Sequence, residues 1–349
     1  MGVVRRTATP SIARPTLESV AALAGVSRGT ASRALNGGVN VSPRALEAVQ
    51  QAAERLGYRP NLAARSLVLG RSGSVGLMVS ESDDRLFNDP FFAAIIRGVH
   101  SVLAAQGVQL VLTLAQTSGE RTNMVRFASG RHLDGILLIS MPGGDPLPGS
   151  LLSAGLPVVL CGRGTRESAA SGLWWVDADN RGGARLAVQH LLDSGRRKVA
   201  TVAGPRYLAV GRDRLAGWRD VLKATTGDAP SELVERGDFL AETGYEGTRR
   251  LLERVPDVDA IFAGADLIAL GVLQALRECG RRVPDDVAVI GFDDIPAAAR
   301  IDPPLTTVKQ PIEAIGTRMA EMLMHRIAGD PVDPPWAILP TELVLRTSA

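Results

Sequence analysis

The strongest constraint on the fold is a run of helix start and stop signals between residues 16 and 57. Thr16 can cap a first helix, and Gly25 is placed to end it. Ser27 can cap a second helix that runs to about Leu35. Two short helices joined by a tight glycine turn predict a helix-turn-helix, a motif that places the first turn of its second helix in the major groove of DNA.

A third helix is predicted after Ser42, with Pro43 at its first position and Gly57 at its end. Its apolar stripe consists of Leu46, Val49, Ala53 and Leu56. We expect this helix to brace the other two. The alternative interpretation is a generic three-helix domain with a solvated arginine face.

Charge favours the DNA-binding interpretation. Up to Ser72 the chain carries ten arginines and three glutamates, a net charge of +7, whereas the whole chain carries only +2. The remainder is therefore mildly acidic. A basic N-terminal head (residues 1–72) followed by an acidic remainder indicates that the protein contacts nucleic acid through the head alone. Residues 1–14 show no periodicity, so we expect a disordered tail there.

The start of the second helix supplies groups that can read bases. Arg28 can bind guanine through its O6 and N7 atoms. Gly29 has no side chain, so the base that it faces is read weakly or by close approach of the backbone. Arg33 lies further along the helix and can reach a base or a phosphate. Short hydroxyl donors suited to phosphates or base edges are Ser27, Thr30 and Ser32.

From Ser74 the pattern changes to apolar strands separated by helical stretches, among them a helix over about 91–106. Apolar strands without polar alternation indicate a parallel sheet covered on both faces, in which ligands bind at the carboxyl ends of the strands. Two such units are expected, one on each side of about Ser194. The predicted strands are Val75–Val79, Val108–Leu114, Gly135–Ser140, Val158–Cys161, Val199–Ala203, Ala260–Ala263 and Val287–Gly291.

The sequence offers no catalytic or metal-binding constellation. None of the three lysines follows a phosphate-loop glycine, and the four histidines lie far apart. We therefore expect no enzyme activity, no metal and no cofactor. Cys161 and Cys279 are interpreted as buried thiols in a reducing cytosol. No signal peptide or membrane-spanning stretch is recognised, so we expect a cytoplasmic protein.

Specific motifs then follow one another in the head. Gly-Val-Ser-x-x-Thr-x-Ser-Arg, Leu-Asn, Val-Ser and Leu-Gly-Tyr-x-Pro-Asn-x-x-Ala-Arg-Ser-Leu stand in order between Gly25 and Leu67. The stretch from Thr16 to Leu67 resembles the headpiece of the LacI/GalR family of bacterial transcription regulators. Ala31 departs from the pattern, because a larger β-branched residue is common there, which is a change in packing.

The resemblance implies a hinge helix after Pro60 that folds only on operator DNA, paired with its copy in a dimer. Leu67 would then wedge a base step in the minor groove. The alternative is a plain linker with Leu67 packed on the body. The residues expected at DNA are Thr16, Ser27, Arg28, Gly29, Thr30, Ser32, Arg33, Asn36, Asn61, Ala64, Arg65 and Leu67.

The resemblance to this family continues after the hinge, through the rest of the chain up to about Arg346. Its motifs include Val176–Asn180, Arg214–Trp218, Gly291–Asp294 and Pro304–Thr307. They resemble the family's effector-binding core, which is similar to type I periplasmic binding proteins. The resemblance implies two lobes, three crossover strands and a ligand between the lobes.

The expected domains are a tail (1–14), a helix-turn-helix domain (15–59), a hinge and linker (60–72) and a core (73–349). Within the core we expect an N-terminal lobe over about 73–194 and 312–328. The C-terminal lobe is expected over about 195–306 and 331–349. A tetramer helix is not expected after Trp336, although dimer and tetramer remain open.

Several residues are candidates for the effector site. By the resemblance, Arg214 reaches ligand oxygens, Phe239 stacks on a sugar face or a base, and Asp293 accepts bonds from two hydroxyls. An internal salt bridge is the alternative for Arg214, and core packing is the alternative for the phenylalanines. Ala265 replaces an asparagine of several relatives. The full candidate set is Phe91, Phe92, Arg212, Arg214, Phe239, Asp266 and Asp293.

We therefore expect a repressor that binds palindromic operator DNA as a homodimer under the control of a small molecule. A carbohydrate effector is favoured. A purine or nucleoside is the alternative, and it would promote DNA binding where most sugars release it. A sugar transport receptor and a sugar-modifying enzyme are the hypotheses of other classes, and the basic head and the missing catalytic groups speak against them.

Overall fold

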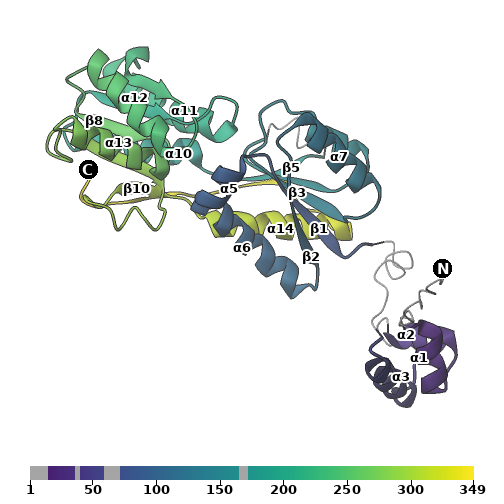
Figure 1. The fold of residues 1–349 in the computed structure, drawn as a ribbon. Helices are drawn as coiled ribbons and strands as arrows, with labels where there is room; N and C mark the ends of the chain where they lie inside the picture. The colour runs from purple at the N-terminus through teal and green to yellow at the C-terminus, as the bar shows by residue number, and fades with distance from the viewer. Residues whose placement is uncertain (1–14, 36–39, 59–70, 165–171) are drawn as a thin grey trace, which may run out of the picture. The chain divides into compact units, whose positions relative to one another are not determined.

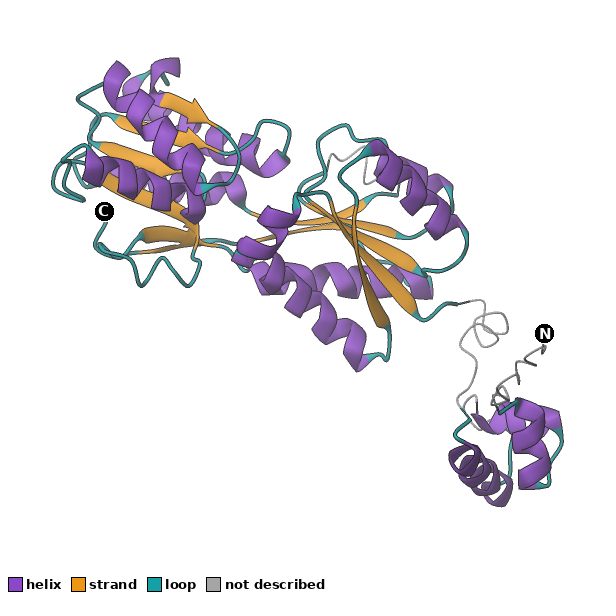
Figure 2. Cartoon of the chain, in the orientation of Figure 1, coloured by secondary structure: helices purple, strands orange, loops and turns teal. Residues whose placement is uncertain are grey.

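The computed structural model describes residues 15–35, 40–58, 71–164 and 172–349. Contacts divide the chain into two compact units, Met1–Ser72 and Gly73–Ala349. Among the described residues the first unit is helical, and the second contains the strands (Figure 2). In the same part of the chain, no helix is long and apolar enough to cross a bilayer.

The first unit consists of α1 (Leu17–Ala24), α2 (Arg28–Leu35) and α3 (Pro43–Leu56), as the caps predict. The hydroxyl of Thr16 accepts the backbone N–H of Ser19 at 3.3 Å, and the Ser19 hydroxyl accepts the Thr16 N–H at 2.9 Å. Gly25 and Gly57 end their helices at φ 65° and 62°, a conformation that favours glycine. The three helices meet at a core of Val20, Ala21, Ala31, Ala34, Val49, Ala52 and Ala53.

Two six-stranded sheets build the second unit, and we call the parts around them the N-lobe and the C-lobe. The N-lobe sheet has the order β11-β5-β4-β3-β1-β2, and all its neighbouring strands are parallel. Its strands are β1 (Ser74–Val79), β2 (Gln109–Leu114), β3 (Gly135–Ile139), β4 (Val158–Cys161), β5 (Trp174–Ala178) and β11 (Trp336–Leu339).

Helices cover the N-lobe sheet (Figure 1). The helices α6 and α14 pack side by side and share a buried cluster with β1, β3, β4 and β5. The helices α7 and α8 pack together over a second apolar cluster. The N-lobe helices are α5 (Asp83–Asn88), α6 (Pro90–Ala105), α7 (Ser118–Ser129), α8 (Leu147–Ser153) and α14 (Ile312–Ala328).

The C-lobe sheet has the order β12-β10-β9-β8-β6-β7, and among its described strand pairs only β10–β12 is antiparallel. Its strands are β6 (Val199–Ala203), β7 (Val234–Arg236), β8 (Ala260–Ala263), β9 (Ala288–Asp293), β10 (Thr306–Lys309) and β12 (Glu342–Val344). Its helices are α10 (Asn180–Asp193), α11 (Ala209–Thr226), the 3-10 turn η1 (Ser231–Leu233), α12 (Ala241–Arg254) and α13 (Asp266–Glu278).

The described chain passes between the lobes three times, after β5, after β10 and after β11. The predicted α/β core with three crossovers is therefore confirmed, but two lobe limits differ from those expected. The helix α10 (Asn180–Asp193) packs on α11 and the C-lobe sheet, although it was expected in the N-lobe. The strand β11 pairs with β5 in the N-lobe sheet, although it was expected in the C-lobe. The first crossover comes before its expected boundary and the last comes after it, because the chain changes lobes at a strand end, after Ala178 and after Leu339.

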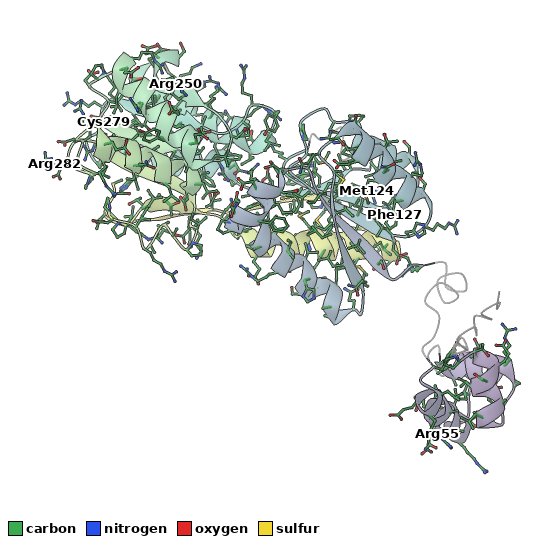
Figure 3. All side chains as sticks on the ribbon, viewed as in Figure 1. Arg55, Met124, Phe127, Arg250, Cys279 and Arg282 are labelled. Atoms are coloured by element: carbon green, nitrogen blue, oxygen red, sulfur yellow. The ribbon has the colours of Figure 1, made fainter. Side chains whose placement is uncertain are left out.

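The interpretation of both cysteines as buried is wrong for one of them. Cys279 is exposed at the end of α13 (Figure 3), and Cys161 is half-buried at the end of β4. Cys279 continues the helical spacing of the buried Ala275 and Leu276, but it is the C-cap residue and lies past the last turn of the buried face of α13. Burial raises the pKa of the Cys161 thiol, with a smaller contribution from Asp177.

Candidate functional site: a helix-turn-helix surface and an interlobe cavity

The helix α2 exposes side chains that were expected to read DNA. Ser27, Arg28, Gly29 and Arg33 are exposed, whereas Ala31 on the inner side of the helix is fully buried. An added Cβ at Gly29 would meet only the Ser27 hydroxyl, at 3.8 Å. The start of α2 is therefore an open polar surface that a base edge can approach.

Ser27 and Thr30 fix the first turn of α2. The Ser27 hydroxyl accepts the Thr30 backbone N–H at 3.1 Å and lies 2.9 Å from the Thr30 hydroxyl. Arg28 Nε lies 3.0 Å from a carboxylate oxygen of Glu18, with side chains 72% and 60% exposed. Such an exposed ion pair is weak because water and salt screen it. Arg28 is therefore available to a base.

Five of the expected DNA contacts lie outside the described residues: Asn36, Asn61, Ala64, Arg65 and Leu67. Their roles, and those of the hinge and of the tail over 1–14, stay predictions.

A cavity of about 680 Å³ lies between the N-lobe and the C-lobe. Small-molecule sites commonly have volumes of about 300–1,000 Å³. The cavity is bordered by the carboxyl ends of β3, β4 and β9, the position expected for ligands of parallel sheets. The expected residues that line it are Phe91, Arg212, Arg214, Phe239 and Asp293.

Arg214 on α11 is at the centre of a buried polar network. Its Nε donates to the Asn180 side-chain oxygen at 2.9 Å, and its Nη1 donates to the Gly264 carbonyl at 2.7 Å. The same Nη1 lies 3.0 Å from Asp293 Oδ1. Burial lowers the pKa of Arg214, and Asp293 opposes that shift. A fixed guanidinium beside a carboxylate offers donors and acceptors together, which is what neighbouring hydroxyls require.

Asp293 at the end of β9 reaches the cavity through an unusual backbone. Its φ is 122°, and that of Asp294 is 57°. Such conformations of non-glycine residues cost about 1–3 kcal/mol and gather at ligand sites. Gln310 Nε2 donates to Asp293 Oδ1 at 2.6 Å. Burial raises the pKa of Asp293, and Arg214 opposes that shift.

Phe239 is almost completely buried, and arginines lie against its ring. The guanidinium carbon of Arg85, from the N-lobe, lies 5.0 Å from the ring centroid, and that of Arg214 lies 5.7 Å away. The ring also packs on Gly204, where an added Cβ would come within 2.3 Å of it. The predicted stacking of Phe239 on a sugar or a base stays a prediction, because much of the ring is already covered.

Polar contacts join the lobes beside the cavity. Arg163 Nη2, after β4, donates to Asp213 Oδ1 on α11 at 2.7 Å. The backbone N–H of Gly143 donates to the Tyr207 carbonyl at 2.8 Å. These bonds hold the lobes together on one side, so the arrangement is closed around the cavity.

Two expected residues do not line the cavity. Phe92 is 1% exposed and packs in the N-lobe core, because it lies on the inner face of α6 while Phe91 faces the cavity. Asp266 is fully buried in the C-lobe, where its carboxylate accepts the Thr307 hydroxyl at 2.6 Å and the Ile295 N–H at 2.9 Å. We infer that Asp266, through these two hydrogen bonds, holds the end of β9 in position.

Comparisons with known proteins agree with this arrangement. Residues 16–61 match the model of the bacterial regulatory proteins of the lacI family, and residues 188–349 match a periplasmic binding protein-like domain. The chain is 47% identical over 337 residues to the HTH-type transcriptional regulator CelR of Thermobifida fusca, covering 96% of this chain and 98% of the relative. The chain belongs to the LacI family.

Other LacI-family relatives extend the comparison. The ribose operon repressor of Halalkalibacterium halodurans is 34% identical, with 95% of this chain and 96% of the relative covered. A solved CelR–cellobiose complex superposes with a TM-score of 0.77 at 45% identity over 96% of this chain and all of that one. A lac repressor dimer bound to operator and the anti-inducer ONPF gives 0.84 at 29% identity, over 96% and 98%.

This LacI-family chain is a ligand-responsive transcriptional regulator that binds operator DNA as a dimer. The predicted family and regulatory class are thereby confirmed.

The sequence reasoning missed several cavity residues of this LacI-family core. Arg85, Arg163, Asp177 and Asn180 line the cavity and were not among the candidates. The Val176–Asn180 motif contained the signal for two of them. Asn180 donates to Asp177 Oδ1 at 2.8 Å and accepts from Arg214. It therefore connects the hydrogen-bond network of Arg214 in the C-lobe to Asp177 in the N-lobe. The neighbouring Asp179 caps α10, where its side chain accepts the Gly182 N–H at 2.9 Å.

The stability of the LacI-family core should fall as pH rises from about 4 to about 7. Burial raises the pKa of Asp177 to about 7 from its ordinary value of 3.8. The folded chain therefore holds this proton more tightly than the unfolded chain. Its contribution to stability is fully present below about pH 4 and is lost as pH rises through about 7. We expect a thermal unfolding midpoint a few degrees higher at pH 5 than at pH 8, measured by circular dichroism.

The variant Asp177→Asn should reduce this pH slope. It should not remove the slope, because burial also raises the pKa of Asp266 and Asp293. The pKa of Asp220 and that of Asp286 are both about 2, so these ion-paired groups titrate below the range from pH 5 to pH 8 that is compared. A wild-type midpoint that rises between pH 5 and pH 8, or an unchanged slope in the variant, contradicts the assignment.

Proposed function

We propose that this regulator is a repressor whose effector is a β-linked glucose disaccharide of the cellobiose class, and that the effector releases the operator. The observation that carries this proposal is the 47% identity to CelR over nearly the whole of both chains, together with the solved CelR–cellobiose complex. The ribose operon repressor and the PurR repressor are less similar to this chain, at 34% and 32% identity.

The cavity chemistry supports a saccharide. Arg214 and Asp293 place a donor and an acceptor 3.0 Å apart, so a pair of ring hydroxyls can bond to both. A single pyranose ring fills only part of about 680 Å³, which leaves room for a second ring. We propose ligand contacts for Phe91, Arg212, Arg214, Phe239 and Asp293, whereas Phe92 and Asp266 act through packing and support.

The effector would act through the angle between the lobes. A ligand that contacts both walls favours the lobe arrangement in which those contacts form together. The strand β1 starts at Ser74, directly after the segment that joins the core to the helix-turn-helix. A movement of the N-lobe can therefore change the position of the hinge, because the two are consecutive in the chain. Thermodynamic linkage then requires that operator binding and effector binding change each other's affinity by the same factor.

We also infer that the protein works in the cytoplasm, where operator DNA lies, and that it binds its effector without converting it. Both inferences rest on relatives that are transcriptional regulators. They complete the proposal of a sugar sensor for gene expression.

Calorimetric titration of the dimer should show cellobiose binding at least about tenfold tighter than glucose. Saturating cellobiose should weaken operator binding roughly 10- to 100-fold, the usual size of allosteric coupling. Fluorescence anisotropy with a palindromic operator from the protein's own gene region measures the second effect. Purine bases serve as the comparison ligands.

Binding of a purine with tighter operator binding would replace the sugar proposal by co-repression. Cellobiose binding without any change in operator affinity would contradict the release mechanism while leaving the ligand assignment intact.

A further inference from the structure

Arg85 belongs to a helix that the sequence did not predict. The short helix α5 (Asp83–Asn88) lies between β1 and α6 and is capped by Ser82, whose hydroxyl accepts the Arg85 N–H at 3.3 Å. This helix places Arg85 on the N-lobe wall of the interlobe cavity. The side chain is only 9% exposed, which is unusual for an arginine.

The hydrogen bonding of Arg85 is incomplete. Its Nη1 donates to the Glu81 carboxylate, which is also buried. Its Nε lies 3.8 Å from Asp89 Oδ2 and has no hydrogen-bond partner among the described residues. Buried donors in native structures almost always find an acceptor. Nε itself is covered, but the guanidinium lines the cavity, so a ligand oxygen there can add an acceptor to a cation whose own set of acceptors is incomplete.

Arg85 also spans the two lobes. Its guanidinium carbon lies 5.0 Å from the centroid of Phe239 in the C-lobe and 5.6 Å from that of Phe92 in the N-lobe. Asp89, which caps α6, lies 3.8 Å from Arg85 Nε, and both Arg85 and Arg214 oppose the burial that raises the pKa of its carboxyl. Two arginines from opposite walls thus face one region of the cavity.

We propose that Arg85 is an effector-binding and specificity-determining residue that donates hydrogen bonds from the N-lobe to hydroxyl oxygens of the bound saccharide. This inference rests on the proposed sugar effector and adds an N-lobe contact to the C-lobe contacts of Arg214 and Asp293. The planar guanidinium suits it for two parallel bonds to neighbouring oxygens. Because Arg85 touches Phe239 in the other lobe, ligand binding there favours the closed arrangement.

The opposite role is also open to experiment. If Arg85 merely covers the face of the Phe239 ring until a sugar displaces it, removing its side chain should strengthen sugar binding. If it binds the sugar, its removal should weaken binding. The sign of the change in affinity therefore separates a ligand contact from a competitor.

Calorimetric titration of the full-length dimer with cellobiose provides the test. Arg85→Met should weaken cellobiose binding roughly 10- to 100-fold, the loss expected for hydrogen bonds from a charged donor. Arg85→Lys keeps the charge but loses the planar fork, so we expect a smaller loss. Arg97→Met is the matched control, because Arg97 is an exposed arginine of α6 that pairs with the exposed Glu313, at 3.6 Å.

Arg85→Met leaves Glu81 buried without its partner, so the double variant Glu81→Gln/Arg85→Met is measured beside it, with circular dichroism melting to establish folding. Weaker binding in both folded variants supports the proposal. Unchanged or tighter binding overturns the role of Arg85 and leaves the proposed function standing. If the wild-type dimer binds no mono- or disaccharide of glucose at all, both the proposed function and this inference fail.

Discussion

Arg214→Met should abolish effector binding and leave a regulator that stays on its operator. We expect effector affinity to fall more than about 100-fold, because the guanidinium is a proposed ligand contact and also orients Asp293 and Asn180. The change also leaves Asp293 without its positive partner, a loss of about 3–5 kcal/mol for a broken buried pair. Calorimetry, urea unfolding and operator anisotropy with saturating effector measure the three consequences.

Two variants separate the ligand effect from the stability effect. Arg214→Met/Asp293→Asn removes the unpaired charge, so it should recover part of the stability without recovering binding. Arg219→Met is the matched control, because Arg219 is an exposed arginine of the same helix, α11, and is not among the residues that line the cavity. Retained effector affinity in the double variant would place Arg214 in a structural role.

The helical unit could be predicted nearly completely because its signals are local. Thr16, Ser42 and Pro43 act within a few residues of the backbone groups that they cap. Gly25 and Gly57 adopt the left-handed conformation that the sequence pattern implies. Caps of this kind need no tertiary partner, so the sequence alone determines them.

The cavity could be predicted only in part, because a side chain's exposure depends on how its helix rotates against the sheet. Phe91 and Phe92 are neighbours in sequence, yet one faces the cavity and the other packs in the core. Asp266 comes just after a strand end, where ligand-binding residues are expected. Its carboxylate is instead bonded to Thr307 and Ile295 inside the C-lobe. Such distinctions arise from contacts between distant segments.

Arg85 could not be found from the sequence for another physical reason. The helix α5 has six residues, too short to be stable alone, and it forms because Ser82 caps it and Arg85 pairs with Glu81. Its residues also lack an apolar stripe at helical spacing. A feature stabilised by buried polar contacts leaves no periodic signal, although it can place a functional side chain.

Arg28→Met should reduce the affinity for the operator roughly 30-fold or more. One bidentate contact to a guanine accounts for about 1–3 kcal/mol of discrimination, and a dimer on a palindrome makes the contact twice. The stability of the helical unit should hardly change, because the Arg28–Glu18 pair is exposed. Fluorescence anisotropy with operator and with scrambled duplex, at matched salt, measures the specific and non-specific affinities.

The ratio of those two affinities identifies what Arg28 does. Arg28→Lys keeps the positive charge but cannot make the planar bidentate contact, so the specific affinity should fall while non-specific binding stays nearly constant. Arg55→Met is the matched control, since Arg55 is an exposed arginine near the end of α3 (Figure 3) and carries the same charge. If Arg28→Met lowers operator and scrambled-duplex binding equally, Arg28 contacts phosphate. The reading of the operator would then depend on the other exposed residues of α2, with Arg33 the next to test.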